Sequence, residues 1–414
     1  ERVVITGVGV ESPLGQETAG IWRGLLEGSS GIVPITWFDA TGHVAHFAAC
    51  VRDFEPERHM DVRAAKRMDR FVQFAVAAAG RAIEDAGLDL KTEDPTRIGV
   101  EIGSAIGGMR TIEEQSRVLY ERGPRRVKPT CVPMVIVNMA ACQVGIEFGL
   151  KGPTAAPVAA CATGLVALGD AMWRLRSGQA DVILAGGTES ADSSLGVAAF
   201  GRLGALSARN DEPERACRPF DLERDGTVLG EGAVVLVLET LSHARARGAE
   251  IRAEMIGYGL TGDAYHMAAP EPSGDGAARA MSAALACARL APTDIHYIAA
   301  HGTGTQLNDA SETRAIKQAF GPAAYRIPIS SCKPVVGHML GAAGAFSVLV
   351  LIQTLASRVI HPTKNLETPD PVCDLDYVPG EPREADVDTA MANAFGFGGQ
   401  NASVILTRFD GRLT

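Results

Sequence analysis

Several features that would restrict the location or the cofactors of this protein are missing from its sequence. The eight cysteines form no CxxC pair, so we expect no zinc site. A chain of 414 residues needs no disulfides for stability, so we interpret the cysteines as free thiols in the reducing cytoplasm. No run of apolar residues approaches the roughly 18 that a membrane span requires. Residues 1–7 enter a predicted strand at once, which leaves no room for a signal peptide.

An excess of positive charge is missing as well. The chain has 39 Lys and Arg against 49 Asp and Glu, a formal net charge of −10. This balance argues against broad nucleic-acid binding, which needs a dominant positive field, although it is compatible with a local basic patch. Apolar residues make up 46% and charged residues 21%, as in an ordinary globular protein.

Short β-branched runs alternate with alanine-rich stretches, a pattern typical of a layered α/β fold. The second half of the chain repeats the style of the first, because Cys161 and His338 each precede an apolar Ala/Gly-rich helix. An internal duplication is therefore plausible. The predicted strands are 3–6, 98–102, 181–185, 232–239, 295–300, 327–331 and 402–406; the predicted helices are 71–86, 165–176, 277–289, 310–320 and 341–357.

The first candidate for chemistry is Cys161, in the segment 157–164. There a short apolar run ends and an apolar helix begins at the cysteine. A thiol at a helix N-terminus feels the positive end of the dipole and free backbone N–H groups, which favour the nucleophilic thiolate. The small neighbours Ala160, Ala162 and Gly164 leave space for a substrate. The alternative is a buried, inert cysteine, the usual state of a free thiol.

Two further segments follow predicted strands, where α/β folds build their sites. His301 opens a glycine-rich turn, and its alternative is an ordinary loop histidine. Lys333 and His338 lie among small and apolar residues. A lysine in such surroundings needs a carboxylate partner, for which Asp309 and Glu312 are the candidates, unless it lies at the surface.

Two glycine-rich segments need separate interpretation. Residues 393–401 could bring backbone N–H groups close to a substrate and form an oxyanion hole, but they lack the Lys-Ser/Thr ending of a phosphate-binding loop. Residues 7–12 begin like a dinucleotide fingerprint but lack its third glycine, so a structural role is favoured.

Four cations, Arg63, Lys66, Arg67 and Arg70, follow the spacing i, i+3, i+4, i+7, which predicts one positive helix face. A solvated face is the common interpretation. In a chain of net negative charge, a docking patch for an acidic protein is the alternative. Arg125, Arg126 and Lys128 form a second basic cluster.

Together these segments resemble the β-ketoacyl-acyl carrier protein synthase family, in its elongating branch. The similarity covers essentially the whole chain, and it is carried by residues 160–164, 225–232, 263–267, 301–305, 333–338 and 393–399. The resemblance implies the thiolase fold, two duplicated α/β halves in a five-layered αβαβα sandwich. It also implies an N-terminal half, 1–250, that carries the nucleophile, and a C-terminal half, 251–414, that carries the two histidines and the lysine.

The resemblance also implies a mechanism. Cys161 accepts an acyl chain from a carrier-protein thioester, and a malonyl thioester then loses CO₂. His301 and His338 stabilise the enolate, which attacks the acyl group. The N–H groups of Cys161 and Phe397 hold the oxyanion, and Phe397 also serves as a gate. Lys333, paired with Glu312, organises the histidines.

Further positions match the family's binding residues. Thr303 and Thr305 match contacts to the phosphopantetheine arm, and Ile106 matches the acyl-pocket wall. The basic residues 63–70 match the docking region for the acidic acyl carrier protein. Neither a metal nor a bound cofactor is implied, because the loss of CO₂ supplies the carbanion, and neither nucleic acid nor a membrane is an expected partner.

The sequence leaves the pathway and the partner open. A homodimeric fatty-acid synthase competes with a polyketide ketosynthase paired with a chain-length-factor-like homologue. The sequence of residues 306–313 is more similar to that of the polyketide enzymes, whereas the sequence of residues 398–401 is more similar to that of the fatty-acid enzymes. A non-catalytic chain-length or scaffold subunit is disfavoured because Cys161 and its partners are all present. Acyl-chain length and saturation, and which histidine assists decarboxylation, are not readable.

Overall fold

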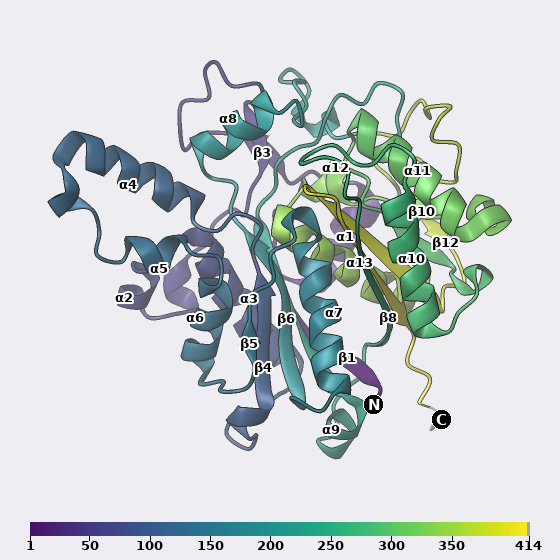
Figure 1. Ribbon diagram of the computed structural model, residues 1–414, viewed down its shortest axis with the longest axis horizontal. Helices are drawn as coiled ribbons and strands as arrows, with labels where there is room; N and C mark the ends of the chain where they lie inside the picture. The colour runs from purple at the N-terminus through teal and green to yellow at the C-terminus, as the bar shows by residue number, and fades with distance from the viewer. Residues whose placement is uncertain (412–414) are drawn as a thin grey trace.

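A computed structural model describes residues 1–411 of the chain (Figure 1). Ten strands form one mixed sheet in the order β10-β9-β13-β14-β8-β1-β7-β6-β4-β5. Their bounds are β1 Val3–Glu11, β4 Ile98–Gly103, β5 Thr154–Ala155, β6 Val182–Glu189, β7 Gly232–Thr240, β8 Ala253–Gly262, β9 Tyr297–Ala299, β10 Ile329–Ser330, β13 Thr389–Gly396 and β14 Gln400–Thr407. Two small sheets pair β2 (Ile32–Pro34) with β3 (Phe47–Ala49) and β11 (Val359–Ile360) with β12 (Arg383–Glu384).

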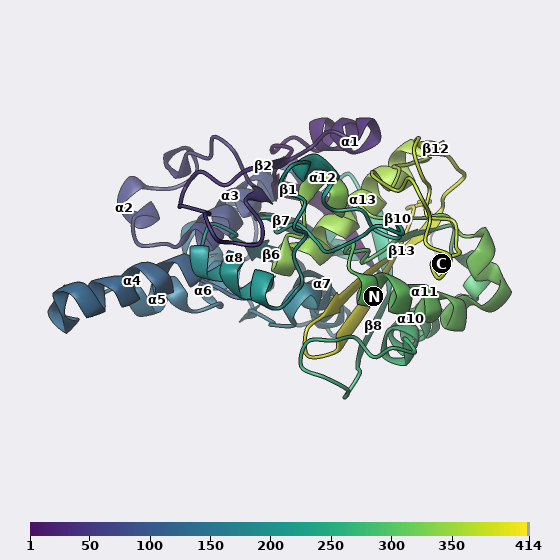
Figure 2. The same ribbon diagram turned by 90° about the horizontal axis from the view of Figure 1, so that it is seen from above.

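The helices cover both faces of this sheet. They are α1 Thr18–Glu27, α2 Val62–Ala65, α3 Arg70–Asp85, α4 Met109–Arg122, α5 Cys131–Val135, α6 Met139–Phe148, α7 Thr163–Arg176, α8 Ser194–Arg202, α9 Leu241–Ala246, α10 Asp275–Ala288, α11 Gln306–Phe320, α12 Lys333–Val336 and α13 Ala343–Ser357. Seen from above, α4 extends at one end of the molecule, and α10 and α11 lie near the other (Figure 2).

The strand order confirms the duplication that the sequence suggested. The first half runs β5-β4-β6-β7-β1 and the second runs β10-β9-β13-β14-β8, so each half places its own strands in the order 3-2-4-5-1. The strand pairings of the two halves also correspond. Strand β4 is parallel to β5 and β6 in the first half, and β9 is parallel to β10 and β13 in the second. The halves meet where β1 pairs antiparallel with β8.

The layers follow the expected thiolase sandwich. Helices α3 and α6 cover the outer face of the first half, and α10 and α11 cover that of the second (Figure 1). Helices α7 and α13 pack against each other and against strands of both halves, as the middle layer. The predicted division at residue 250 falls between α9 and β8 and stays a prediction, because the strands form one continuous sheet.

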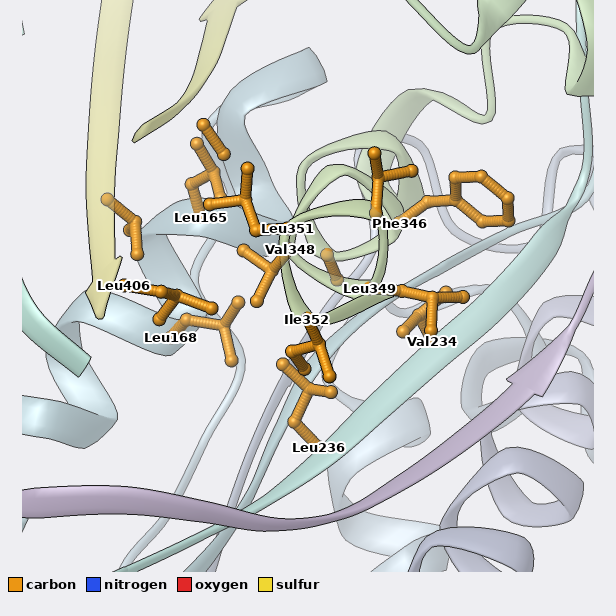
Figure 3. Close-up of a cluster of buried hydrophobic side chains, with 14 of the residues drawn as sticks. Leu165, Leu168, Val234, Leu236, Phe346, Val348, Leu349, Leu351, Ile352 and Leu406 are labelled. Atoms are coloured by element: carbon orange, nitrogen blue, oxygen red, sulfur yellow. The ribbon is translucent and has the colours of Figure 1, made fainter. Parts of the chain in front are cut away.

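Helix α13 is the centre of the largest apolar core, as an all-round apolar helix should be. Figure 3 shows its side chains meeting Leu165 and Leu168 of α7, Val234 and Leu236 of β7, and Leu406 of β14. The sequence analysis expected no membrane-length apolar segment, but Leu340–Ser357 reaches that length with a mean hydropathy of 1.8. Because 83% of it is buried inside the protein, this segment is the core helix of the fold.

Candidate functional site

Cys161 lies in the 3₁₀ turn Ala160–Ala162, directly before α7. Ala160 has a φ of +47°, a left-handed conformation that is uncommon for a residue with a side chain. The hydroxyl of Thr163 donates to the carbonyl of Ala160 at 2.7 Å and accepts from the N–H of Ala159 at 2.9 Å. These two hydrogen bonds hold the turn, so the thiol is fixed where helix α7 begins.

The two predicted histidines reach the same cavity as this thiol. The cavity has a volume of about 630 Å³, and Cys161, His301, His338 and Phe397 are among its lining residues. His301 follows β9 and His338 follows α12, so three segments far apart in the sequence supply these side chains. The structure therefore brings together the residues on which the sequence interpretation most depended.

His301 and His338 form a close pair of neutral imidazoles. Their ring centroids are 5.3 Å apart and their planes are nearly perpendicular, at 82°. Burial lowers the pKa of both rings well below the usual value, and the nearby charge of Lys333 lowers it further. Both side chains are therefore uncharged at neutral pH, and each can donate one N–H to a substrate oxygen.

Lys333 lies at the start of α12 and is buried, with 2% of its surface exposed. Its ammonium group donates to the backbone carbonyl of His301. The predicted ion pair is wrong: within residues 1–411 Lys333 is not within ion-pair distance of Glu312 or Asp309. The lysine instead acts as a local cation that lowers the pKa of the thiol and of both imidazoles.

Glu312 and Asp309, both on α11, hold the backbone of the histidine loop. The Glu312 carboxylate accepts from the N–H groups of His301 and Gly302, each at 2.8 Å. Asp309 accepts from Gly304 at 3.3 Å. Burial raises the pKa of Glu312 to about 7. Both residues therefore support the site through backbone hydrogen bonds; Lys333 forms no direct ion pair with Glu312, although its charge lowers the pKa of that carboxyl.

The pKa of the thiol differs from the sequence prediction. Burial is the largest influence and raises the pKa of Cys161 to about 12. Lys333 and the backbone N–H groups of Phe397 and Cys161 lower the pKa, whereas Glu189 raises it. The predicted thiolate is therefore wrong for the protein without substrate, where burial outweighs Lys333 and the backbone N–H groups at the helix start. The predicted N–H pair does lie at the sulfur, where an oxyanion would form.

Phe397 lies at the tip of a β-hairpin, where the sequence analysis expected a loop over residues 393–401. Strand β13 continues to Gly396 and β14 begins at Gln400. The turn between them uses positive φ angles at Gly398 and Gly399 (+87° and +74°). The ring of Phe397 is 37% exposed and stacks on Phe200 at 6.2 Å, at the wall of the cavity.

Thr303 and Thr305 line the same cavity, whereas Ile106 is not among its lining residues. The hydroxyls of the two threonines lie 3.0 Å apart, and that of Thr305 also caps α11. Ile106 is half-buried against the apolar cluster that contains Cys161 and Leu340. Its assignment to an acyl pocket stays a prediction.

The prediction that the four cations form one basic helix face is wrong. Helix α2 ends at Ala65 and α3 begins at Arg70, so the four cations do not share a helix. Arg63, Lys66 and Arg67 are exposed. The Arg70 side chain turns inward, where it forms an ion pair with buried Glu231 at 2.8 Å and lies 4.5 Å over the Phe74 ring. Three of the four predicted docking residues therefore remain at the surface.

Sequence reasoning missed one residue beside the nucleophile, Glu189. It ends β6 with no exposed surface, and its charge acts on Cys161. An acidic residue directly after the buried run Gly186-Gly187-Thr188 was the available signal. Among residues 1–411 no cluster of three His, Cys, Asp or Glu side chains has the arrangement of a metal site.

Comparisons with known proteins agree with this geometry. The family models described as "Beta-ketoacyl synthase, N-terminal domain" and "Beta-ketoacyl synthase, C-terminal domain" match residues 1–244 and 252–367. The 3-oxoacyl-[acyl-carrier-protein] synthase 2 of Coxiella burnetii is 48% identical over 98% of both chains. The protein of the same name from Synechocystis is 47% identical over 99% of this chain and 98% of its own.

Solved structures of similar fold include a β-ketoacyl synthase from Burkholderia phymatum, with a TM-score of 0.93, 38% identity and coverage of 99% of this chain and 100% of that one. A type II polyketide ketosynthase, solved in complex with its acyl-carrier protein, has a TM-score of 0.91 at 36% identity, with 99% of each chain covered. The matches extend through both halves, over the turn of Cys161 and the loop of His301. The chain belongs to the β-ketoacyl synthase family.

Proposed function

We propose that this protein is an elongating β-ketoacyl synthase, which joins a malonyl unit on acyl carrier protein to an acyl chain held on Cys161. One observation carries the proposal: a thiol at a helix start and two neutral imidazoles share one cavity of about 630 Å³. A nucleophile that can carry an acyl group and donors for a developing enolate are the groups that a decarboxylative Claisen condensation needs.

In the first step the Cys161 sulfur attacks the thioester carbonyl of the acyl carrier. The N–H groups of Cys161 and Phe397 stabilise the oxyanion, and the carrier thiol leaves with the proton that the Cys161 thiol gives up. Lys333 favours this step because its charge lowers the pKa of the buried thiol. An acyl thioester on Cys161 and a free carrier result.

In the second step a malonyl carrier thioester loses CO₂. His301 and His338 donate hydrogen bonds to its thioester oxygen, where the enolate charge develops. The carbanion then attacks the acyl carbonyl on Cys161. A new carbon–carbon bond forms, the bond to sulfur breaks, and the Cys161 thiolate takes up a proton from solvent. The product is a β-ketoacyl chain on the carrier.

The pathway that fits best is fatty-acid elongation in the cytoplasm. The relatives at 47–48% identity carry a 3-oxoacyl-[acyl-carrier-protein] synthase name, whereas the polyketide ketosynthase structures are 36% identical. The second candidate is a polyketide ketosynthase subunit, because one similar structure, with a TM-score of 0.92, is a ketosynthase with its chain length factor. A non-catalytic scaffold subunit is disfavoured, because such a chain has no need of Cys161, His301, His338 and Lys333 around one cavity.

We assign the dimer contact to the edge of the sheet at β5. The strand is partly exposed, and an exposed strand edge is a template for pairing with another chain. Val158, shortly after the strand, is 49% exposed; Val132 and Ile136, in and just after α5, which contacts the same helix α6 as β5 does, are 67% and 40% exposed. After purification from the native host, light scattering shows whether a dimer forms, and mass spectrometry of its chains distinguishes a homodimer from a complex with a homologue that lacks the cysteine. Recovery of a monomer would remove this assignment.

The carrier protein would dock on the exposed cations Arg63, Lys66 and Arg67. Lys66 and Lys128 also line a second cavity of about 320 Å³ between α3 and α4, so the two basic clusters adjoin. Acyl carrier proteins are acidic, and complementary charge mainly accelerates encounter. Arg70, paired with Glu231, is left out of this surface.

The experiment that tests the function is acyl transfer from a panel of acyl-carrier thioesters, read as the mass added to Cys161. We expect one acyl group per chain, and product formation after malonyl carrier is added. Cys373→Ala is the matched control, since this thiol is also buried but belongs to a different apolar cluster. An acyl group on another residue, or none with any carrier thioester, would refute the proposed function.

A further inference from the structure

Glu189 joins two loops that approach Cys161 from different halves of the protein. One oxygen of its carboxylate accepts from the Ser104 hydroxyl at 2.7 Å. The other accepts from the N–H of Ala105 at 2.7 Å and from the N–H of Gly341 at 3.1 Å. Ser104 in turn accepts from the N–H of Gly107 at 2.8 Å. One side chain on β6 therefore fixes the loop after β4 to the turn before α13.

The contact between these two loops is tight. A Cβ built at Gly341 would lie 2.7 Å from the nitrogen of Ala105 and 3.0 Å from a Glu189 oxygen. Only glycine fits at this position, so the backbones of the loop and the turn touch directly. Any movement of residues 104–107 away from the turn must break hydrogen bonds to Glu189.

A buried carboxylate also holds the corresponding loop of the other half, although it comes from helix α11 and not from a strand. There Glu312 accepts from the N–H groups of His301 and Gly302, in the loop that follows β9. Strand β9 corresponds to β4 in the strand order, so each half holds the loop after its second strand with a buried carboxylate. In the second half that loop carries a catalytic candidate, whereas in the first half it carries Ile106.

Glu189 is satisfied by neutral donors. Among residues 1–411 it forms no ion pair, although it is fully buried. Burial raises the pKa of its carboxyl to about 7. Isolated buried charges are costly, and a group of this kind persists where its hydrogen bonds hold something in place.

Ile106 follows Ala105 in the loop that Glu189 holds, and it packs against the apolar cluster that contains Cys161. This cluster also contains Leu340, which lines the cavity, whereas Ile106 is not among the lining residues. An acyl chain that extended from the sulfur into this cluster would have to part Ile106 from Leu340. Leu340 belongs to the turn that Glu189 holds, and Ile106 belongs to the loop that it holds.

We propose that Glu189 is a positioning residue for acyl binding, which ties Ile106 and Leu340 together and so sets how far the wall beside Cys161 opens. The inference rests on the proposed function, because it concerns the acyl chain on that cysteine. Its substrate consequence is selection by chain length. Short chains need little opening, whereas long chains must work against the hydrogen bonds of Glu189.

The test compares acylation rates of short-chain and long-chain acyl carriers in wild type, Glu189→Gln and Glu189→Ala. Glutamine keeps the shape and can accept from Ala105 and Gly341, so the ratio of long-chain to short-chain rates should stay within about twofold of wild type. Alanine removes every acceptor, and the ratio should rise about fivefold or more, the effect of losing one ordinary hydrogen bond. Iodoacetamide is small and needs no room for an acyl chain. The rate at which it alkylates Cys161 should therefore not change in parallel with the ratio of acylation rates.

Hydrogen exchange gives a readout that does not depend on acylation. In Glu189→Ala the amides of Ala105 and Gly341 should exchange faster together, and in Glu189→Gln they should stay protected. Glu101→Gln is the matched control, because Glu101 is equally buried on β4 but is paired with Arg174 at 2.8 Å. Glu101→Gln should lower the free energy of unfolding, but it should change neither the ratio of acylation rates nor the exchange of the Ala105 and Gly341 amides.

Two results overturn the inference: unchanged exchange at Ala105 and Gly341 in Glu189→Ala, or an equal loss of rate for every chain length. If Glu189→Ala does not fold, Ser104→Ala takes its place: it removes the hydroxyl that joins Glu189 to the N–H of Gly107, so the ratio should rise, and an unchanged ratio would overturn the inference. Failure of wild type to take up acyl groups would instead refute the proposed function, and the exchange result would stand by itself.

Discussion

The two halves of the protein place different side chains on one backbone. The turn Ala160–Ala162 precedes α7, and the turn Leu340–Ala342 precedes α13. Both turns begin with a left-handed residue that has a side chain, with φ of +47° and +44°. At the central position the first half has the thiol of Cys161, and the second half has Gly341.

This difference shows how the site is divided between the halves. The first half supplies the sulfur, and the second supplies both imidazoles and the buried cation. The two turns meet through α7 and α13, where a Cβ at Gly164 would lie 2.7 Å from the nitrogen of Ala345. The duplicated backbone therefore creates a cavity only when both halves pack, and single residues decide which half does which part of the chemistry.

The largest effect is expected for Cys161→Ala, which makes the first turn resemble the second. Without the sulfur no acyl intermediate can form, so acylation and condensation should both fall to background. Mass spectrometry of the protein after incubation with acyl carrier measures the first, and product formation measures the second. Residual acylation at wild-type rate would show that another residue is the nucleophile.

Much of this comparison could be predicted from the sequence. The sequence shows Cys161 before an Ala/Gly-rich helix in the first half and His338 before a similar helix in the second. The glycine-rich turn after β9 identified His301 as a candidate. The strongest elements, such as α3, α7 and α13, lie close to their predicted ranges. Their signals are local, because a helix start or an apolar period is written in neighbouring residues.

The parts that failed depend on tertiary context. Strand β13, Thr389–Gly396, alternates alanine with other residues and has weak strand propensity, so burial in the sheet decides its conformation. The spacing of the cations predicted one helix, but a break between Ala65 and Arg70 turns Arg70 towards Glu231. The thiolate prediction considered the helix start alone, whereas burial dominates the pKa of Cys161.

The next largest effect concerns the histidines of the second half. His301→Ala and His338→Ala each remove a donor to the enolate, so condensation should fall by about 10²- to 10⁴-fold. Acylation of Cys161 should fall much less, because its oxyanion is held by backbone N–H groups. Single-turnover assays separate the two steps. Equal losses in both would assign the imidazoles to the thiol and not to the enolate.

Gly341→Ala sharpens the comparison of the two turns. The new methyl group would meet the nitrogen of Ala105 at 2.7 Å, so the loop after β4 must move. We expect a loss of about 1–3 kcal/mol in the free energy of unfolding, as for other overpacked positions. Denaturant melting measures it. Gly20→Ala on α1 is the control, because its Cβ would meet only the Glu17 Cβ at 3.9 Å, and a loss of similar size there would remove the explanation.

Lys333→Met removes the cation that the second half contributes. Since Lys333 lowers the pKa of Cys161, its removal should raise that pKa, and alkylation at a fixed pH should slow by about tenfold. The pKa of both histidines should rise towards the ordinary value, because the lysine lowers them. Condensation by the variant should therefore decline at a higher pH than that of wild type as the solution is acidified. Unchanged pH profiles would contradict this role.

The smallest effect is expected at the surface of the first half, for Lys66→Glu with Arg67→Glu. Reversing two exposed charges should raise KM for the acyl carrier several-fold, by about 1 kcal/mol, with little change in kcat, because these residues are remote from the cavity. The matched control is Lys91→Glu, an exposed cation beyond the other end of α3, whose 16 residues span about 24 Å. The increase should shrink at high salt, as expected for screened charges. An equal change in KM for the control would show that net charge, and not this surface, governs carrier binding.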